Sequence, residues 1–522
     1  MKNLAPHWIA LTGTVLLTLS WYPPLAPLLF LALVPLLMLE ERLSLRSFWG
    51  WTILMFLGWN VGAIWWLWNA SKWFTLGAWG ANAVLMSLPV VLFSLTRHLS
   101  DGRFRFLPFV MLWLGFEYLH QNWGLTFPWL NLGNVLGAYP MWAQWYEYTG
   151  TLGGSLWFLV GNVLFFQTLI HRSRNAIALA SWILLPFGFS LYLFYTFEPE
   201  AVTPVEVVVV QPNLDCYTEK FARNPQTGEP STNYVPYQKQ VNRLQRLAEE
   251  NLSPETRFVA FPETALHKNV EEGYLLINKN PEYTQLRNWL RAHPGLTLIT
   301  GMDSYYIYKE GEKPSVTARQ GNGFTYDKYN TALFLLPSGE HEFYHKSKLV
   351  IGAETTPFRA AMPVALKDMS GSLGIQPERE VFPHPQDSTH LNAAPVICFE
   401  SVYGEFVTEY EKMNLIFVIT NDGWWGDTPG YRQHLRFSQL RAIEMRRPVA
   451  RSANTGISCF IDARGKITKK LGYGKMGALR GTVQASSAPP TFYARYGDYI
   501  GRIAAFLGIA FLLSAYIRKL RN

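Results

Sequence analysis

The distribution of charged residues along this 522-residue chain is the feature that most constrains its fold. Of the 84 Asp, Glu, Lys and Arg residues, 16 fall within residues 1–200 and 68 fall within the remaining 322. A soluble globular chain carries roughly 25 % charged residues. The sequence therefore predicts a strongly apolar part followed by a part of ordinary soluble composition, which excludes a wholly soluble enzyme and a disordered chain.

Apolar stretches recur eight times, and several approach the roughly 20 residues that a helix needs to cross a bilayer. They lie at 8–20, 24–39, 49–70, 76–96, 106–122, 151–170, 175–196 and 499–517. Tyr22-Pro23-Pro24 interrupts the first run, so we expect a helical hairpin over 1–39. A cleavable signal peptide over 1–20 is the alternative, although a clear small-residue cleavage site is lacking.

Lysine and arginine residues predict how these helices are oriented. Alternate connections on one side hold eleven of them, whereas the short connections on the other side hold only Lys72. The eleven are Lys2, Arg42, Arg46, Arg97, Arg103, Arg105, Arg172, Arg174, Arg518, Lys519 and Arg521. Because positive charge accumulates in cytoplasmic loops, we expect both termini in the cytoplasm. The net charge of +8 is thus explained by the membrane, without a nucleic-acid partner.

These patterns predict three regions: seven transmembrane helices in 1–196, an extracytoplasmic polar domain at 197–496, and a transmembrane helix with its tail at 497–522. The outer connection 119–149 is rich in Trp, Tyr and Phe. It is interpreted either as an interfacial aromatic belt or as an entrance for lipid chains. Charged residues are nearly absent from the spans, with Glu117 and Glu147 near predicted ends, which disfavours a transporter.

The polar domain alternates strand-like and helix-like patterns. β-Branched or continuous apolar runs predict strands at 205–211, 258–261, 296–300, 331–336, 394–398, 415–420 and 451–461. Amphipathic patterns predict helices at 237–251, 283–293, 403–413 and 434–446. This alternation predicts a layered α/β domain. Residues 353–393 are rich in Pro and Gly and are expected to form a lid or binding arm.

Three reactive side chains lie close to predicted strands: Glu263, Lys346 and Cys398. A cysteine at a strand-to-helix junction is favoured as the thiolate by the helix N-terminus, and a carboxylate can act as its base. A lysine can stabilise an oxyanion. Taken singly, each has a plainer explanation, since a buried cysteine is usually structural and a strand-end glutamate is usually solvated.

Together, these residues resemble the nitrilase superfamily. Glu263 in Phe-Pro-Glu, then Lys346, then Cys398 with Glu400 two residues on, occur in that family's order. Seven helices before this domain and one after it resemble the membrane-embedded branch, the apolipoprotein N-acyltransferases. Two further motifs agree with that branch, Thr420-Asn421-Asp422-Gly423-Trp424-Trp425-Gly426 and Leu125-Thr126-Phe127-Pro128-Trp129-Leu130. The resemblance implies an α/β αββα nitrilase-like sandwich plus an all-α bundle of eight transmembrane helices.

The resemblance also implies a role for each matching residue. Glu263 matches the general base, Lys346 the catalytic lysine and Cys398 the nucleophile. Lys346 is preferred to Lys348 because the family places this lysine eight residues before a second glutamate, which is Glu354 here. Glu400 is interpreted as orienting the lysine or a substrate amine, or as a helix cap.

The implied reaction is a ping-pong acyl transfer through a cysteine thioester. A phospholipid, typically phosphatidylethanolamine, donates the acyl chain, and a diacylglyceryl-cysteine apolipoprotein accepts it. The family works in the bacterial inner membrane with its catalytic domain on the periplasmic side. No cofactor or metal is expected, and the chain is expected to be a monomer.

Three positions bear on substrate contacts. Phe399 stands where a Tyr often follows the cysteine, and Phe221 stands where many members carry a Trp. Gly352-Ala353-Glu354 replaces the commoner Phe-Gly-Glu. Trp424 is expected either to line an acyl pocket or to pack in the core.

Cys216 and Cys459 are interpreted as structural thiols, although one disulfide among the three cysteines is possible.

Two other classes of function remain open from the sequence. A membrane-tethered amidase or nitrilase would use the same three residues with water as the acceptor, but it would not need apolar arms or an aromatic entrance. A membrane scaffold or transporter would not require Glu263, Lys346 and Cys398 to converge.

Overall fold

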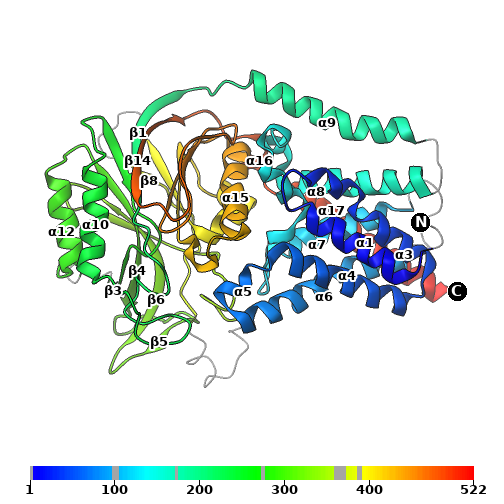
Figure 1. Cartoon of the computed structure of the whole chain (residues 1–522), viewed down its shortest axis with the longest axis horizontal. Coiled ribbons are helices and arrows are strands. Elements are labelled where there is room, and N and C mark those ends of the chain that lie inside the picture. Colours follow the sequence, from blue (N-terminus) through cyan, green and yellow to red (C-terminus); the bar gives the residue numbers. More distant parts are fainter. Residues whose placement is uncertain are drawn as a thin grey trace. The chain divides into compact units, whose positions relative to one another are not determined.

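The computed structural model describes residues 4–96, 105–170, 175–271, 277–357, 372–384 and 391–521 (Figure 1). The chain divides into two compact units, one comprising Met1–Phe197 and Thr491–Asn522 and the other Glu198–Pro490. Residues 358–371 and 385–390 of the expected arm at 353–393 lie outside the described residues. The same holds for Lys2, Arg97, Arg103, Arg172 and Arg174 of the predicted cytoplasmic loops.

The first unit is helical. Its helices are α1 (Pro6–Leu19), α2 (Leu29–Ala32), α3 (Val34–Arg42), α4 (Leu45–Ile64), α5 (Leu67–Ala70), α6 (Lys72–Thr96), α7 (Leu107–Leu119), α8 (Tyr146–Phe165), α9 (Ala176–Thr196), α16 (Phe492–Tyr496) and α17 (Tyr499–Arg521). Within the described residues, four helices are long and apolar enough to cross a membrane: α6, α8 with its extension to Ile170, α9 and α17. The chain is a membrane protein, and eight crossings stay a prediction.

The expected hairpin over 1–39 is interrupted more often than the sequence indicates. α1 is followed by a short 3₁₀ turn at Ala26–Leu28, then by α2 and α3. Pro27 and Pro35 lie at the starts of such short elements, where a missing backbone N–H costs least. The described structure therefore replaces the predicted 24–39 helix by three short pieces.

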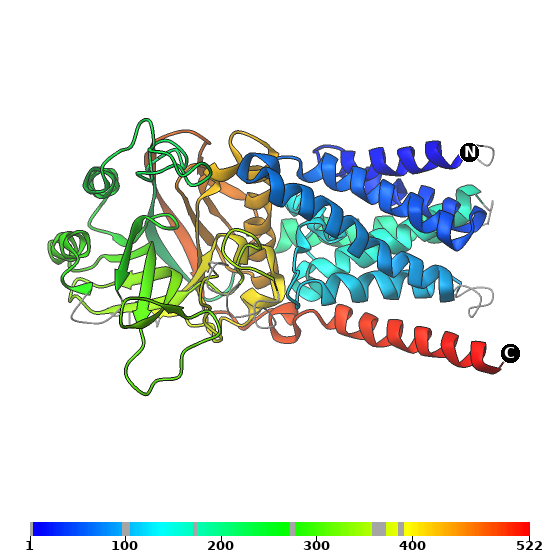
Figure 2. The same cartoon turned by 90° about the horizontal axis from the view of Figure 1, so that it is seen from below.

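α17 packs along α7, although the whole second unit lies between the two helices in sequence (Figure 2). A Cβ atom added at Gly115 of α7 would lie 2.9 Å from the Ala505 Cα of α17. A Cβ atom added at Gly508 of α17 would lie 3.1 Å from a methyl group of Leu112. Small residues at this contact let the two backbones approach closely, as is common between membrane helices.

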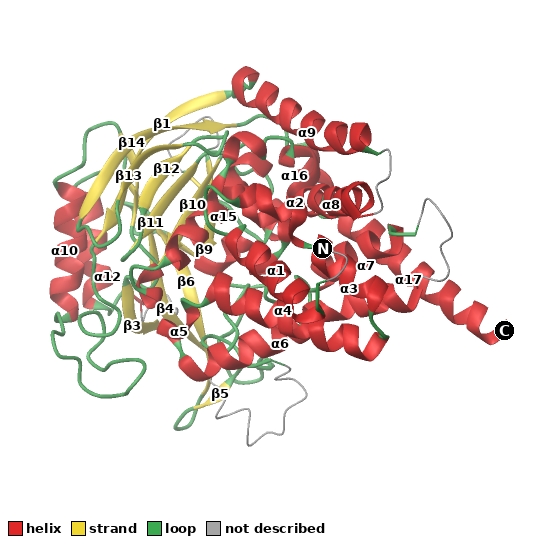
Figure 3. Cartoon of the chain, turned by 45° about the vertical axis from the view of Figure 1, so that its right-hand side comes forward, coloured by secondary structure: helices red, strands yellow, loops and turns green. Residues whose placement is uncertain are grey.

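The second unit contains two β-sheets (Figure 3). In the first, the strands run in the order β14-β1-β2-β4-β6-β5, with β3 beside β4 and β7 beside β6. Their bounds are β1 Val202–Gln211, β2 Thr256–Ala260, β3 Leu266–Glu271, β4 Thr297–Ile307, β5 Arg319–Gln320, β6 Thr325–Leu335, β7 His341–His345 and β14 Gly477–Ser486.

The second sheet has the order β13-β12-β11-β10-β9-β8. Its strands are β8 Phe382–Pro383, β9 Asn392–Ile397, β10 Leu415–Thr420, β11 Val449–Ala453, β12 Ser458–Ile461 and β13 Ile467–Leu471. β9, β10 and β11 are parallel and buried throughout or nearly so, which explains their continuous apolar sequences. Parallel strands end at the same edge, so the residues that follow β9 and β10 are brought together.

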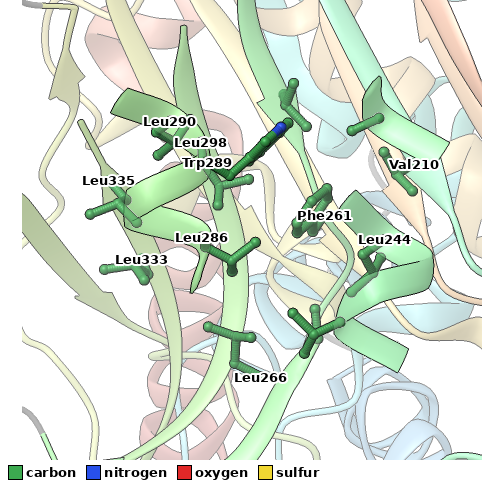
Figure 4. Packing of buried hydrophobic residues seen from close by; sticks show 14 of the residues in the cluster. Val210, Leu244, Phe261, Leu266, Leu286, Trp289, Leu290, Leu298, Leu333 and Leu335 are labelled. Atoms are coloured by element: carbon green, nitrogen blue, oxygen red, sulfur yellow. The ribbon is translucent and has the colours of Figure 1, made fainter. Parts of the chain in front are cut away.

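Helices cover the outer faces of both sheets. α10 (Tyr237–Glu249) and α12 (Pro281–Arg291) lie on the first sheet, and α15 (Pro429–Met445) lies on the second (Figure 1). Leu244 of α10 and Leu286 of α12 pack with Phe261 and Leu298 in one buried cluster (Figure 4). Between the sheets, the rings of Phe258 and Phe417 lie 5.3 Å apart. The layers therefore follow the expected αββα order.

The first and last strands of this unit pair with each other. β1 and β14 are antiparallel over their full length, from Val202 opposite Ser486 to Gln211 opposite Gly477. β1 is also parallel to β2 on its other side. The segment that enters the unit and the segment that leaves it thus form one continuous part of the first sheet.

Two predicted elements of the polar domain are wrong. The run 451–461 is not one strand but two, β11 and β12, which pair antiparallel across the turn at 454–457. The predicted helix 403–413 is limited to α14 (Gly404–Thr408). The turn between β11 and β12 begins at Asn454, whose side-chain amide donates to the carbonyl of Leu214 at 2.8 Å.

Candidate active site

Each of the three predicted reactive residues lies just past the end of a strand. Glu263 follows β2 by three residues, Lys346 follows β7 directly and Cys398 follows β9 directly. β4 allows the Glu263 turn to approach, because a Cβ atom at Gly301 would lie 2.5 Å from the Glu263 Cα. Only glycine fits at that point of β4 without displacing the turn.

Glu263, Lys346 and Glu354 are in direct contact. Lys346 Nζ lies 3.0 Å from Glu263 Oε1 and 2.8 Å from Glu354 Oε1. The side-chain amide of Asn330 donates to the same two oxygens, at 2.7 Å and 2.9 Å. The other oxygen of Glu263 accepts the backbone N–H of Asn421 at 3.0 Å. One lysine and one asparagine therefore bridge the two carboxylates.

The charges of this group follow from its burial and its pairing. Burial alone would raise the pKa of Glu263, but Lys346, the hydrogen bond from Asn330 and the more distant Lys220 outweigh it and hold that pKa below its usual value. Burial alone would lower the pKa of Lys346, but Glu263 and Glu354 raise it well above its usual value. At neutral pH the glutamate is therefore an ionised proton acceptor, and the lysine is a fixed positive charge.

Cys398 is buried, and its thiol is protonated at rest. Burial raises the pKa of this thiol, the charge of Glu263 raises it further, and Lys346 opposes both. The expected gain from a helix N-terminus does not prevail, because the helical segment after the cysteine is a 3₁₀ turn of five residues, Cys398–Val402. The thiolate expectation is therefore wrong for the resting site, and a base must take the proton during attack.

The backbone at Cys398 has a left-handed conformation, with φ of +51°. Such a conformation costs on the order of 1–3 kcal/mol for a residue other than glycine, and it persists only where surrounding contacts enforce it. Thr264, the residue after Glu263, has φ of +49°. Two of the three reactive positions thus lie at or next to strained backbone.

Glu400 connects the cysteine segment to the lysine segment. Its Oε2 accepts the N–H of Ile397 at 2.7 Å, and its Oε1 accepts the N–H of Ser347 and the hydroxyl of Tyr344, both at 2.7 Å. The side chain is fully buried. Both interpretations of Glu400 from the sequence thus have a counterpart here, because it caps the turn at Cys398 and fixes the residue next to Lys346.

Phe221 and Trp424 lie together on another side of the site. Their rings are stacked 6.2 Å apart, and both are half-buried. Lys220 Nζ lies 5.4 Å from the centre of the Phe221 ring and donates to the Thr264 hydroxyl at 2.6 Å. Lys220 also lies 3.3 Å from the Glu263 carbonyl. Phe399 is separate from this pair and packs edge-on against Tyr403 at 5.3 Å.

Asn330, Asn421 and Lys220 are contacts that sequence reasoning does not identify as site residues. Asn421 lies within the Thr420–Gly426 motif, and Lys220 precedes Phe221. For both residues, the sequence therefore offered an adjacent motif that could have identified them. Asn330 had none, because it lies in the middle of β6. Its placement comes from the pairing of β6 with β7, where Thr331 is opposite His345.

All three cysteines are free and buried, so the possible disulfide is absent. The Cys216 thiol lies 3.1 Å from the Asn421 side-chain oxygen, which makes it part of the support around Glu263. Among the residues that the structure describes, no group of three or more His, Cys, Asp or Glu side chains is arranged to hold a metal ion.

In the helical unit, the aromatic connection 119–149 is partly internal. Trp129 and Tyr146 are buried, whereas Trp123 and Tyr148 are each 41 % exposed. Glu117 is also buried, and its Oε1 accepts the N–H of Leu132 at 2.9 Å. A purely interfacial belt therefore does not describe this connection, because three of its eight aromatic rings, Trp129, Trp145 and Tyr146, are buried.

Comparison with known proteins adds two family matches. Residues 13–164 match the apolipoprotein N-acyltransferase N-terminal domain, and residues 233–491 match the carbon-nitrogen hydrolase family. The two matches cover most of both structural units.

Full-length relatives carry both parts in one chain. The apolipoprotein N-acyltransferase of Chlorobaculum tepidum is 26 % identical over 98 % of this chain and 97 % of its own length. That of Geobacter metallireducens is 25 % identical over 94 % of this chain and 92 % of its own. A solved CN-hydrolase superfamily protein of Xanthomonas campestris is 16 % identical, with a TM-score of 0.35 over 58 % of this chain and 97 % of its own.

Proposed function

We propose that this chain, which belongs to the apolipoprotein N-acyltransferase family, works by a ping-pong transfer through a thioester on Cys398. As a member, it is an acyltransferase with lipoprotein substrates. The proposal adds the donor, the order of the steps and the residues that perform them. We assign the donor as a membrane phospholipid, with phosphatidylethanolamine as the reference substrate, and the acceptor as the N-terminal amine of diacylglyceryl-cysteine.

In the first step, Cys398 attacks the sn-1 ester carbonyl of the phospholipid. Glu263 takes the thiol proton as the sulfur–carbon bond forms, and Lys346 stabilises the oxyanion. The ester carbon–oxygen bond then breaks, and the leaving oxygen receives the proton from Glu263. A lysophospholipid leaves, and the acyl chain remains on the sulfur. The ionised glutamate and the charged lysine support this division of roles.

In the second step, the α-amine of the apolipoprotein attacks the thioester. Glu263 takes a proton from the attacking nitrogen, the carbon–sulfur bond breaks, and the proton returns to the sulfur. Lys346 again faces the oxyanion. With the amine entering as its unprotonated form, the cycle neither gains nor loses a proton, and Glu263 carries the proton in both steps.

One observation carries the proposal. Glu263 and Lys346 converge from two separate strand ends, Glu354 joins them from the turn at 352–354, and the charges of Glu263 and Lys346 both act on the Cys398 thiol. A scaffold or transporter does not require that convergence. Glu354 holds the lysine at 2.8 Å, and Glu400 keeps its segment beside Cys398. We assign both as positioning residues, and the Phe221–Trp424 pair as a substrate contact.

The test is a covalent adduct. The purified full chain, incubated with phosphatidylethanolamine, is expected to gain one acyl chain on the Cys398 peptide, detected by mass spectrometry and removed by hydroxylamine. Adding a diacylglyceryl-cysteine peptide should discharge the adduct and give an N-acylated peptide. Discharge at the same rate without the peptide, with release of free fatty acid, would favour a hydrolase instead.

Matched variants assign the residues. Cys398→Ala keeps Cys216 and Cys459, so an undiminished adduct in that variant would overturn the nucleophile assignment. Glu263→Ala and Lys346→Ala should each lose the adduct while remaining folded. A normal acylation rate in either variant would remove that residue from the mechanism.

A further inference from the structure

A buried polar network lies behind the nucleophile, on the side of its backbone carbonyl. That carbonyl accepts two hydrogen bonds, from Ser401 Oγ at 2.8 Å and from His434 Nε2 at 3.0 Å. A carbonyl oxygen can only accept, so the Nε2 atom must carry a proton in this contact. His434 therefore donates to the residue whose left-handed backbone presents the thiol.

The other side of the His434 ring is held just as firmly. Its Nδ1 atom lies 2.8 Å from Asp422 Oδ1, and the second oxygen of Asp422 accepts from Arg451 Nη2 at 2.8 Å. Burial alone would raise the pKa of Asp422, but Arg451 and His434 outweigh it and lower that pKa to about 2. Asp422 is therefore an ionised acceptor at any working pH. All three side chains are fully buried.

The three residues come from separate elements. His434 lies on α15, Arg451 lies on β11, and Asp422 follows β10. Trp425 packs edge-on against the imidazole at 5.6 Å. Contacts on both ring nitrogens therefore hold the imidazole, and its position is set by the second sheet and the helix that covers it.

We propose that His434 is a positioning residue for the nucleophile: it fixes the Cys398 carbonyl through Nε2, while Asp422 and Arg451 fix its own ring. The proposal rests on Cys398 being the acylated residue. Because a peptide is planar, fixing the carbonyl also fixes the plane of the Cys398–Phe399 peptide and limits where the thiol can point. The Nε2 atom lies 3.0 Å from the Cys398 carbonyl and 3.1 Å from the Ser401 hydroxyl, so the proposal gives His434 no proton transfer with substrate.

A small displacement of the Cys398 thiol is expected to slow its attack on the ester strongly. A misplacement of about 1 Å at a reacting group can lower a rate by about 100-fold. Loss of the His434 contact is therefore expected to reduce the acylation rate without changing the affinity for phospholipid, because no substrate contact is removed. That separation of kcat from KM distinguishes a positioning role from a binding role.

Two variants of His434 separate its two nitrogens. In His434→Gln, the amide nitrogen can reach the Nε2 position and still donate to the Cys398 carbonyl. In His434→Asn, the shorter amide can reach only the Nδ1 position, so it keeps the Asp422 contact and loses the carbonyl. We expect the Asn variant to lose about 100-fold in acylation rate at saturating phosphatidylethanolamine. The Gln variant should retain most of the wild-type rate, and KM should be unchanged in both.

The comparison uses the full chain in detergent, with thermal unfolding measured on each variant. Equal losses in the two variants, or losses that follow the fall in Tm, would overturn the proposal. If wild type itself forms no adduct on Cys398, the proposed function fails, which is a different result from a failure of His434.

A second variant covers the case in which the His434 variants do not fold. Asp422→Asn leaves the imidazole in place but removes the charge that orients it. The proposal expects a lower acylation rate at unchanged KM in this variant. A folded Asp422→Asn protein with the wild-type rate would contradict it.

Discussion

At the scale of single residues, Lys220 supplies a second buried positive charge beside the proposed general base. Its Nζ atom contacts the Glu263 carbonyl and the Thr264 hydroxyl, and it lies over the Phe221 ring. Burial lowers the pKa of Lys220 and raises that of the nearby Asp303 to about 6, against the pull of Lys220. Lys220 therefore contributes to the field in which Glu263 must stay ionised.

We predict that Lys220→Met shifts the pH dependence of acylation. The charge of Lys220 lowers the pKa of Glu263, so removing it raises that pKa, and the base becomes protonated at a higher pH. The acidic limb of the acylation rate should therefore move to higher pH, while the alkaline plateau stays. The charged or titratable groups that face Glu263 are Lys346, Glu354, Lys220, Asp303, Cys216 and Cys398.

Lys239→Met is the matched control, because Lys239 is an exposed lysine of α10. Its profile should coincide with that of wild type. A Lys220→Met profile that also coincides with wild type would show that this charge does not act on the base.

Residues next to strand ends were predictable, and residues within strands were not. Glu263 and Cys398 each follow a run of apolar sequence, whereas Lys346 follows the mixed polar and aromatic segment 341–345. The order of the three residues matches a known family. Asn330 lies inside β6 and gains its role only from the register with β7. The raised pKa of the Cys398 thiol was not predictable either, since it comes first from burial in the fold and then from the charge of Glu263, 135 residues away in sequence.

At the scale of elements, the contact of α7 with α17 depends on three glycines. Gly115, Gly501 and Gly508 each lie where a Cβ atom would meet the other helix. In a membrane, such contacts are stabilised by close packing, because lipid is as apolar as the side chains. Adding a single methyl group at one of these glycines is therefore expected to push the two helices apart and to weaken their contact.

Gly115→Ala is predicted to destabilise the helical unit. The added Cβ atom would lie 2.9 Å from the Ala505 Cα, and backbone cannot move aside as a flexible side chain can. Overpacking of this kind costs roughly 1–3 kcal/mol, so the Tm of the detergent-solubilised protein should fall. Gly80→Ala in α6 meets nothing within 4 Å and should leave the Tm unchanged or higher.

A Tm for Gly115→Ala equal to that of Gly80→Ala would show that the two helices can separate without loss of stability. Because both substitutions replace a glycine inside a helix by the same residue, their intrinsic helix propensities cancel in the comparison.

Periodic elements were predictable from local sequence, and tertiary turns were not. α10 has buried positions at Val241, Leu244 and Ala248, the spacing of one helix face. The division of 451–461 into β11 and β12 depends on Asn454, whose partners Leu214 and Asn421 are distant in sequence. β7 was not predicted as a strand, because only Tyr344 of its five residues is buried.

At the scale of the whole molecule, the charge distribution predicts which side of the membrane each unit faces. From the eleven cationic residues on one set of connections, we expect both termini in the cytoplasm and the second unit outside. Cys216, Cys398 and Cys459 are all buried, so the labelling of introduced, exposed thiols can be compared with that of the unsubstituted protein.

We predict opposite labelling for two introduced cysteines. Lys313→Cys lies in the second unit and Arg42→Cys lies in a predicted cytoplasmic connection, and both positions are exposed. A membrane-impermeant maleimide should label Lys313→Cys in intact spheroplasts, but Arg42→Cys only after permeabilisation. Labelling of Arg42→Cys before permeabilisation would reverse the predicted orientation, and unsubstituted protein serves as the control.

The pairing of β1 with β14 has a consequence for synthesis. Val202 pairs with Ser486, so the first strand of the second unit stays without one neighbour until nearly 300 further residues have been made. Strand pairing between such distant segments is slow, and an open sheet edge invites aggregation meanwhile. A nascent chain of this protein must therefore be shielded late into translation, and truncation anywhere before β14 should leave an unfinished sheet rather than a smaller working enzyme.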